Sequence, residues 1–153
     1  MPDCFISYST HDHQFATFLC DELRHHNISS FMASVSLRPG ERWSPEILGN
    51  LRGANWVLVL ASRSASASAY VNQEIGGALL LSKNIVPIVW GLSPAELPGW
   101  LREFQAIDLR GSTLPALQQH IATIANRITQ QKATGYLILG AITLALLMLT
   151  GKE

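Results

Sequence analysis

The stretch from Asn55 to Ser62, NWVLVLAS, decides between the classes of fold open to this chain. Its apolar residues follow one another without the alternation of a strand that has one wet face. Such a run is typical of a strand buried on both faces of a sheet. Strands of this kind occur in parallel sheets covered by helices, so the stretch predicts an α/β fold.

The chain on either side of this stretch alternates between strand and helix patterns. Four further short apolar runs predict strands over residues 4–9, 28–33, 84–91 and 105–111. Apolar residues at helical spacing predict helices over residues 10–26, 44–54, 70–83 and 112–131. Together they predict a five-stranded parallel sheet with helices on both faces. Right-handed crossovers make a flavodoxin-like, doubly wound order its simplest closure.

Two local features qualify this prediction. The Ser- and Ala-rich residues 62–69 predict a loop or a frayed helix entry, and residues 91–104 predict a loop with one helical turn. Pro87 lies inside a predicted strand and indicates a sheet edge or a local break, because proline has no N–H for the ladder.

Composition limits the possible functions. The 153 residues suffice for one domain, and 11 basic residues balance 11 acidic ones. The lack of a basic excess argues against a nucleic-acid-binding protein. The two cysteines, Cys4 and Cys20, have no zinc-site spacing and are expected to be small buried apolar residues. His11 and His13 flank Asp12, but we expect them to be solvated, and we predict no metal site.

Several nucleotide and hydrolase motifs are missing. The sequence has no Gly-x-Gly-x-x-Gly after a strand, no Gly-x-x-x-x-Gly-Lys and no Gly-x-Ser-x-Gly. These absences argue against a Rossmann dinucleotide site, a P-loop and a serine-hydrolase elbow. The third predicted strand ends in Leu60-Ala61 and lacks the Asp of a phosphoacceptor domain.

The C-terminal residues 133–151 carry no charge and lie between Lys132 and Lys152. Nineteen helical residues would be about 28 Å long, close to the ~30 Å of a bilayer core. The pattern predicts a hydrophobic transmembrane helix, a tail anchor that follows a domain over residues 1–131 and leaves it facing the cytoplasm. The alternatives are a buried C-terminal helix and a helix stacked in an oligomer.

Glu74 is the one charged residue between Ser64 and Ser82. A carboxylate in such apolar surroundings costs free energy unless it is used. It follows one of the loops at the carboxyl ends of the strands, where doubly wound sheets bind ligands. Two interpretations remain open: a catalytic group, or an acid that complements the dipole at a helix N-terminus.

Five segments in order resemble a Toll/interleukin-1 receptor (TIR) domain of the bacterial kind. They are DCFISYSTHD, SLRPGERWSPEI, WVLVLAS, SAYVNQEIGGAL and NIVPIVW, and the resemblance spans about residues 3–110. The first resembles the family's box 1, the second its BB loop, and the fourth the start of its glutamate-bearing helix. The resemblance implies the flavodoxin-like TIR fold.

The resemblance also implies an activity. Many TIR domains cleave the nicotinamide–ribose bond of NAD, and Glu74 stands where they have their catalytic glutamate. A carboxylate suits this reaction because it can stabilise positive charge on the ribose or activate water. NAD would be the substrate, and no cofactor is expected. Hydrolysis to ADP-ribose and cyclisation both remain open.

The resemblance places eight further residues near the substrate: Tyr8, Ser9, Thr10, Arg38, Arg42, Trp43, Ser68 and Tyr70. Four of them have a structural alternative: the arginines could be exposed loop charges, Trp43 could pack a helix, and Ser68 could be a helix cap. Two departures are clear. Phe31-Met32-Ala33 lacks the acid that often ends the second strand, and Tyr70 replaces a common Trp.

Other TIR domains are adaptors without activity, and this second interpretation predicts function through TIR–TIR assembly alone. Under both interpretations we expect self-association. We also expect a sensor or effector in another protein, because no second soluble domain is evident. A role in antiphage or immune signalling is implied by the resemblance alone.

Overall fold

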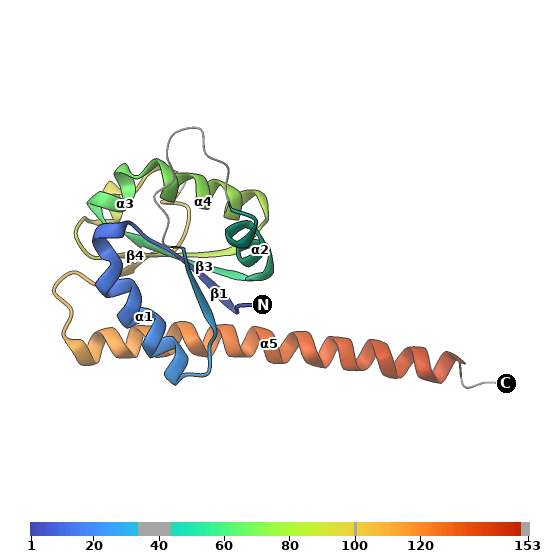
Figure 1. Cartoon of the computed structure of the whole chain (residues 1–153). Coiled ribbons are helices and arrows are strands. Elements are labelled where there is room, and N and C mark those ends of the chain that lie inside the picture. Colours follow the sequence, from blue (N-terminus) through green and yellow to red (C-terminus); the bar gives the residue numbers. More distant parts are fainter. Residues whose placement is uncertain (34–43, 100, 151–153) are drawn as a thin grey trace.

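A computed structural model describes residues 1–33, 44–99 and 101–150 of the chain, with the side chains of residues 70, 145–147, 149 and 150 outside this description. Five parallel strands form one sheet in the order β2-β1-β3-β4-β5. Their bounds are Cys4–Ser7 (β1), Ser30–Ala33 (β2), Trp56–Ala61 (β3), Asn84–Val89 (β4) and Ile107–Asp108 (β5). The predicted flavodoxin-like α/β sheet is confirmed (Figure 1).

Helices cover both faces of this sheet. The α-helices are His13–His25 (α1), Pro45–Gly53 (α2), Arg63–Ala67 (α3), Ala69–Leu80 (α4) and Leu114–Thr150 (α5). Two 3-10 turns, Thr10–Asp12 (η1) and Pro94–Glu96 (η2), lie in the connections. Figure 1 shows α1 and α5 on one face and α2, α3 and α4 on the other.

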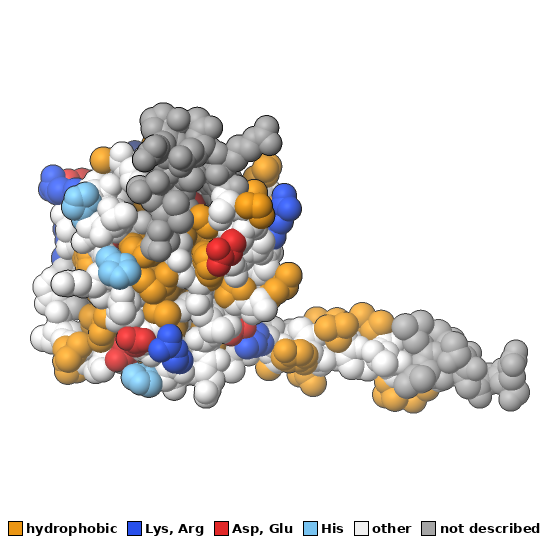
Figure 2. Space-filling model, viewed as in Figure 1, with side chains coloured by type: hydrophobic (Ala, Val, Ile, Leu, Met, Phe, Trp, Pro, Cys, Tyr) orange, Lys and Arg blue, Asp and Glu red, His pale blue; other side chains and the backbone are white. Residues whose placement is uncertain are grey.

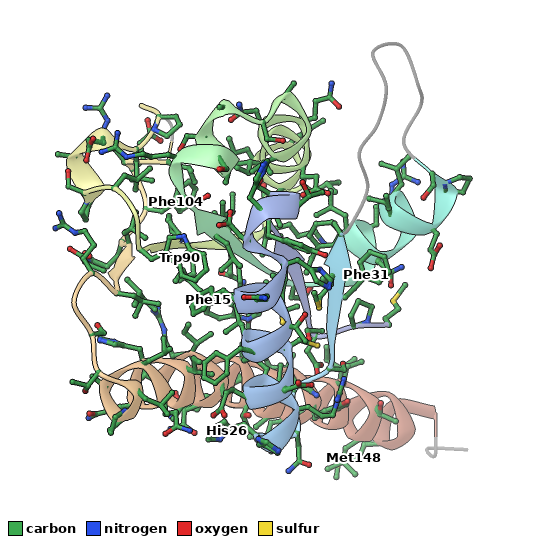
Figure 3. All side chains as sticks on the ribbon, turned by 60° about the vertical axis from the view of Figure 1, so that its left-hand side comes forward. Phe15, His26, Phe31, Trp90, Phe104 and Met148 are labelled. Atoms are coloured by element: carbon green, nitrogen blue, oxygen red, sulfur yellow. The ribbon has the colours of Figure 1, made fainter. Side chains whose placement is uncertain are left out.

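Each face of the sheet has its own hydrophobic core. Alternate residues of β1 point to opposite faces, so Cys4 and Ile6 pack with α1 and α5 while Phe5 packs with α2 and α4. β3 is buried at every residue, as its unbroken apolar run predicts. Figure 3 shows Phe15 of α1 beside Trp90, at the end of β4; their ring centroids lie 3.9 Å apart.

Pro87 is in register with Val59 inside β4, and β4 lies between β3 and β5. β4 is therefore neither broken at Pro87 nor the outermost strand, but the predicted edge exists locally at this residue. β5 pairs with β4 only at Ile88 and Val89, so up to Pro87 one side of β4 has no strand partner. A residue without an N–H fits there.

The prediction of a loop or a frayed helix entry over residues 62–69 missed a separate short helix, α3, which lies within them. Ser62 is its N-cap and accepts a hydrogen bond from the backbone N–H of Ala65 at 3.0 Å. Ser68 then caps the next helix, α4. Two serine caps six residues apart thus divide what read as one polar stretch into two helix starts.

At the C-terminus, the helices predicted over residues 112–131 and 133–151 form one continuous helix, α5. Its first half packs Ile121, Ile124 and Ile128 into the core. Its second half projects away from the sheet, with exposed apolar side chains such as Tyr136, Leu137 and Ile142 (Figures 1 and 2).

The predicted transmembrane helix over residues 133–151 is not supported. Within the described residues, no helix is both long enough and apolar enough to cross a membrane.

Candidate active site

The side chain of Glu74 is fully buried, with an exposed fraction of 0%. It lies on the core-facing side of α4, on the same face as Val71 and Ala78, which pack in the core beneath the helix. Its Oε2 accepts a hydrogen bond from the hydroxyl of Ser7, the last residue of β1. A glutamate 67 residues away is thus held against the carboxyl end of the first strand.

The position of Glu74 within α4 weighs against a role limited to the helix dipole. Ser68 caps α4, and Glu74 is the sixth residue of a helix that begins at Ala69. The dipole favours acids chiefly in the first turn, and Glu74 lies beyond it. The helix dipole therefore gives little reason for an acid at this point.

The contact between Glu74 and Ser7 lies where the order of the strands in the sheet reverses. β1 has β2 on one side and β3 on the other, so the order of strands reverses between β1 and β3. In open α/β sheets this is where a crevice forms beyond the carboxyl ends of the strands. Glu74 therefore lies at the position expected for a ligand site in this type of fold.

The residues after β1 also lie at this edge of the sheet. Ser9 is nearly buried and caps η1 by accepting a hydrogen bond from the N–H of His11 at 3.3 Å. Thr10 is exposed and begins η1. Asp12 is 7% exposed and accepts a hydrogen bond from the hydroxyl of Ser62 at 2.5 Å.

Tyr8 packs in the core on the α1 and α5 face of the sheet. It is 3% exposed. Its hydroxyl lies 3.2 Å from Nδ1 of His13, in α1. Neighbouring residues of an extended segment point to opposite faces, so Ser7 lies on the face of α4 while Tyr8 packs with α1 and α5.

Ser68 is half-buried and serves as the N-cap of α4, accepting from the N–H of Val71 at 3.3 Å. The capping alternative is therefore confirmed, and a role in substrate binding stays a prediction. Tyr70 lies in the first turn of α4, but its side chain is not described. Arg38, Arg42 and Trp43 fall outside the described residues.

Three residues at this edge were missed by sequence reasoning: Ser7, Asp12 as an acceptor, and Ser62. Strand alternation could have found Ser7, because it shares a face with Phe5 and that face is covered by the helix bearing Glu74. The contact between Asp12 and Ser62 joins residues that are 50 positions apart, so no local sequence pattern predicts it.

A cysteine nucleophile and a metal site have less support in the described residues. Burial raises the pKa of the Cys4 thiol to about 12, so the thiolate needed of a nucleophile is scarce at neutral pH. In the described part of the chain, no three His, Cys, Asp or Glu side chains are grouped so as to hold a metal ion.

A hollow at the opposite edge of the sheet does not involve Glu74. It is a cavity of about 270 Å³ bounded by the start of β1, the start of β3 and the middle of α5, and its lining includes Asp3, Trp56, Lys132 and Tyr136. Asp3 and Lys132 form an ion pair with each other at 2.8 Å. Both charges are thereby neutralised, and we assign no reaction to this cavity.

Comparison with known proteins identifies the family. A family model described as TIR domain matches residues 4–124. The chain belongs to the TIR domain family. The match establishes this much of the predicted resemblance, while the narrower likeness to bacterial TIR domains stays a prediction.

Solved TIR structures share the fold. The TIR domain of the Toll-related receptor TRR-2 from Hydra magnipapillata is 21% identical, with a TM-score of 0.60 over 80% of this chain and 99% of that one. The TIR domains of the activated Roq1 resistosome, which recognises the pathogen effector XopQ, are 17% identical, with a TM-score of 0.70 over 84% and 99%.

A third match is to part of a longer protein. The TIR-STING receptor from C. gigas, in complex with 2',3'-cGAMP, is 20% identical, with a TM-score of 0.64 over 82% of this chain. The match covers 39% of that receptor chain. At these identities the comparisons establish the fold of the TIR domain and nothing finer.

Proposed function

We propose that this TIR domain is an enzyme that cleaves the bond between nicotinamide and ribose in NAD, with Glu74 as its catalytic residue. The observation that carries the proposal is the fully buried carboxylate of Glu74, which is held by Ser7 at the point where the strand order reverses. Burying a carboxylate destabilises the folded state, and folding alone gives no reason for one at this position.

The reaction needs one group of this kind. The bond between C1′ of the ribose and the pyridinium nitrogen breaks, and its electron pair leaves with nicotinamide. The ribose carbon gains oxocarbenium character, which a nearby carboxylate stabilises. The oxygen of water then bonds to C1′ and releases a proton, giving ADP-ribose, or another nucleophile of the same molecule closes a cyclic product. Glu74 would take the proton from water in the first case.

The hydroxyl of Ser7 would fix which way the carboxylate points. It donates its proton to Oε2, so the position of this oxygen relative to the end of β1 is set before substrate arrives. A positioned acceptor does not have to reorganise as charge develops on the ribose. Ser9, Thr10 and Ser68 lie at or near the same edge and are proposed to contact the nucleotide.

The burial of Glu74 implies that the site opens before a nucleotide reaches it. We propose that self-association of TIR domains provides this step, so that activity rises with protein concentration. The proposal includes a use in antiphage or immune signalling. It is supported by family membership and by the likeness to TIR domains of an activated resistosome.

A second candidate function is favoured by the same burial. A carboxylate closed off from solvent is compatible with an adaptor that acts by TIR–TIR assembly without catalysis. The two functions differ in one respect: the adaptor needs Glu74 only for folding. A substitution that keeps the fold and the hydrogen bond from Ser7 therefore separates them.

The test is nicotinamide release from NAD by the full chain, measured over a range of protein concentrations, beside Glu74→Gln. Glutamine keeps an oxygen that accepts from Ser7 but has no negative charge. We expect the rate to fall by about 10² or more, with an unchanged circular dichroism spectrum and melting temperature within a few degrees.

The matched control is Glu46→Gln, the same change at an exposed residue in the first turn of α2, which should leave release unchanged. Nicotinamide release that survives Glu74→Gln would reject Glu74 as the catalytic residue. No release by the assembled wild-type chain, combined with intact self-association, would favour the adaptor.

A further inference from the structure

A second buried carboxylate, that of Asp12, lies at the same edge of the sheet and has no role in the reaction proposed above. Asp12 ends η1 and is the N-cap residue of α1, yet its side chain makes no capping hydrogen bond to its own helix. An Asp at this position usually accepts from a backbone N–H of the helix it begins. Here it accepts from the hydroxyl of Ser62, beyond the end of β3, at 2.5 Å.

Ser62 uses both of its hydrogen-bonding capacities in this contact. Its oxygen accepts a hydrogen bond from the N–H of Ala65 and so caps α3. Its single O–H group donates a hydrogen bond to Asp12. Asp12 therefore sets the direction of the hydroxyl that starts α3. Figure 1 shows the beginning of α1 next to α3, at the end of the molecule far from the C-terminus.

From α3 the connection continues to the helix of Glu74. The side-chain amide of Asn72, in α4, donates to the carbonyl oxygen of Ser66, in α3, at 3.3 Å. Asn72 precedes Glu74 by two residues. Ser68, between the two helices, donates its backbone N–H to the carbonyl oxygen of Ala65 at 3.0 Å.

These contacts connect the end of β1 to α4 by two separate routes. One route joins β1 to α4 through Ser7 and Glu74. The other joins the residues just after β1 to α3 through Asp12 and Ser62, and α3 to α4 through Asn72. Ser7 and Asp12, where the two routes start, are five residues apart, and each route includes a hydroxyl that donates to a buried carboxylate.

We infer that Asp12 is a positioning residue for the active site: through Ser62 it holds α3 and the start of α4 so that Glu74 meets Ser7. The inference rests on the proposed function for its catalytic consequence, while its structural content is independent of it. A buried carboxylate that leaves its own helix uncapped costs free energy in two ways, and this role accounts for both.

Two variants of Asp12 separate the effect of its hydrogen-bond acceptor from the effect of its charge. Asp12→Ala removes the acceptor, while Asp12→Asn keeps an oxygen that can accept from Ser62 and removes the charge. The matched control is Asp21→Ala, an exposed Asp later in α1 that pairs with Arg24 at 3.0 Å. Ser62→Ala removes the same contact from the other side.

The first measurement is amide hydrogen exchange in the full chain, which needs no enzymatic activity. We expect Asp12→Ala to speed exchange over residues 63–74 about tenfold, as the loss of a hydrogen bond to a charged group predicts. Amides of residues 121–128, in the buried half of α5, should keep their protection. Asp12→Asn should restore most of the protection over residues 63–74, and Ser62→Ala should match Asp12→Ala.

The second measurement is steady-state nicotinamide release. We expect Asp12→Ala to lower kcat about tenfold with KM changed less than twofold, and Asp12→Asn to recover most of kcat. In the double variant with Ser62→Ala, the loss should be no greater than in either single variant.

Four results would overturn the inference. One is exchange over residues 63–74 that is unchanged in Asp12→Ala; another is exchange that rises equally throughout the chain, which would make the role purely structural. A third is Asp12→Asn behaving like Asp12→Ala, because the charge and not the hydrogen bond would then matter. The fourth is a wild-type kcat in Asp12→Ala. If the wild-type chain releases no nicotinamide, the proposed function fails, and the exchange measurement still decides whether Asp12 holds α3.

Discussion

The two edges of the sheet hold their carboxylates in different ways. At the edge where the strands begin, Asp3 accepts from Lys132 at 2.8 Å and from both the N–H and the hydroxyl of Ser29 at 2.9 Å. At the edge where the strands end, Glu74 and Asp12 are more deeply buried, and the described contacts are with the hydroxyls of serines.

This difference separates stabilisation from chemistry. A carboxylate paired with a lysine has its charge neutralised, and the pair ties the middle of α5 to the start of β1. A carboxylate enclosed in the protein acts more strongly on a nearby charge than a carboxylate in water does. The first arrangement suits a structural contact, and the second suits a group that meets a developing positive charge.

Among the contacts at the two edges, the largest effect is expected from removing the hydroxyl of Ser7. Ser7→Ala removes the donor to Glu74 and should lower kcat for nicotinamide release by about tenfold to a hundredfold, the range for a lost hydrogen bond to a charged group. Ser29→Ala removes a hydroxyl donor to Asp3 and should leave kcat unchanged. Rates for both variants, measured beside their melting temperatures, test the comparison.

Equal losses of kcat in the two variants would contradict it, because hydroxyl donors would then matter only through overall stability. A Ser7→Ala variant with full activity would show that the orientation of Glu74 is set by its other surroundings. Ser7→Thr provides a conservative check, since threonine retains the hydroxyl and should recover part of the rate.

The fold was largely predictable from the chain because its signals are local and repeated. The apolar run of β3 and the helical spacing of α1 each act within a few residues. The exceptions arose where neighbours override local preference. α3 depends on Ser62, whose hydroxyl is directed by a residue 50 positions earlier, and Pro87 fits β4 because β5 is short.

The site was predictable in one residue and not in its partners. Glu74 stood out because charge is rare in its helix. The family resemblance placed Tyr8 at the cleft, and this stays a prediction; in the structure Tyr8 packs in the core with α1 and α5. Ser7 is 67 residues from Glu74, and only the stacking of α4 over β1 brings the two together.

A smaller effect is expected from the ion pair at the opposite edge. Partial burial would raise the pKa of Asp3, but the hydrogen bonds from Lys132 and Ser29 outweigh it and lower the pKa below its ordinary value. The folded state thus binds the proton more weakly than the unfolded state. The pair's contribution is complete above the ordinary pKa of about 3.9 and is lost as the pH falls through the lower folded value.

Lys132→Met should therefore lower the free energy of unfolding by about 1 kcal/mol at neutral pH, as is typical of a partly exposed pair, and leave kcat unchanged. The measurement is urea unfolding at a series of pH values. Between about pH 5 and about pH 3 the wild-type chain should lose more stability than Lys132→Met does. Parallel losses in the two proteins would show that the ion pair does not set the pKa of Asp3.

The smallest effect is expected at Asp108, which lies at the end of β5, on the same edge as Glu74, but is paired as Asp3 is. Its two oxygens accept from Nε and Nη2 of Arg110 at distances of 2.9 and 2.6 Å. Hydrogen bonds from Arg110 lower the pKa of Asp108 to about 2. Both side chains are exposed, so water already solvates much of their charge.

Arg110→Ala should raise the pKa of Asp108 toward its ordinary value of about 3.9, seen by NMR titration of the carboxyl carbon. Neither kcat nor the urea midpoint at neutral pH should change, because exposed pairs contribute little to stability. Arg24→Ala, which removes the exposed partner of Asp21, should leave the titration of Asp108 unaltered. A loss of kcat in Arg110→Ala would mean that lying at this edge is enough to affect the reaction. Unchanged kcat would assign the distinction to burial, which Glu74 has and Asp108 lacks.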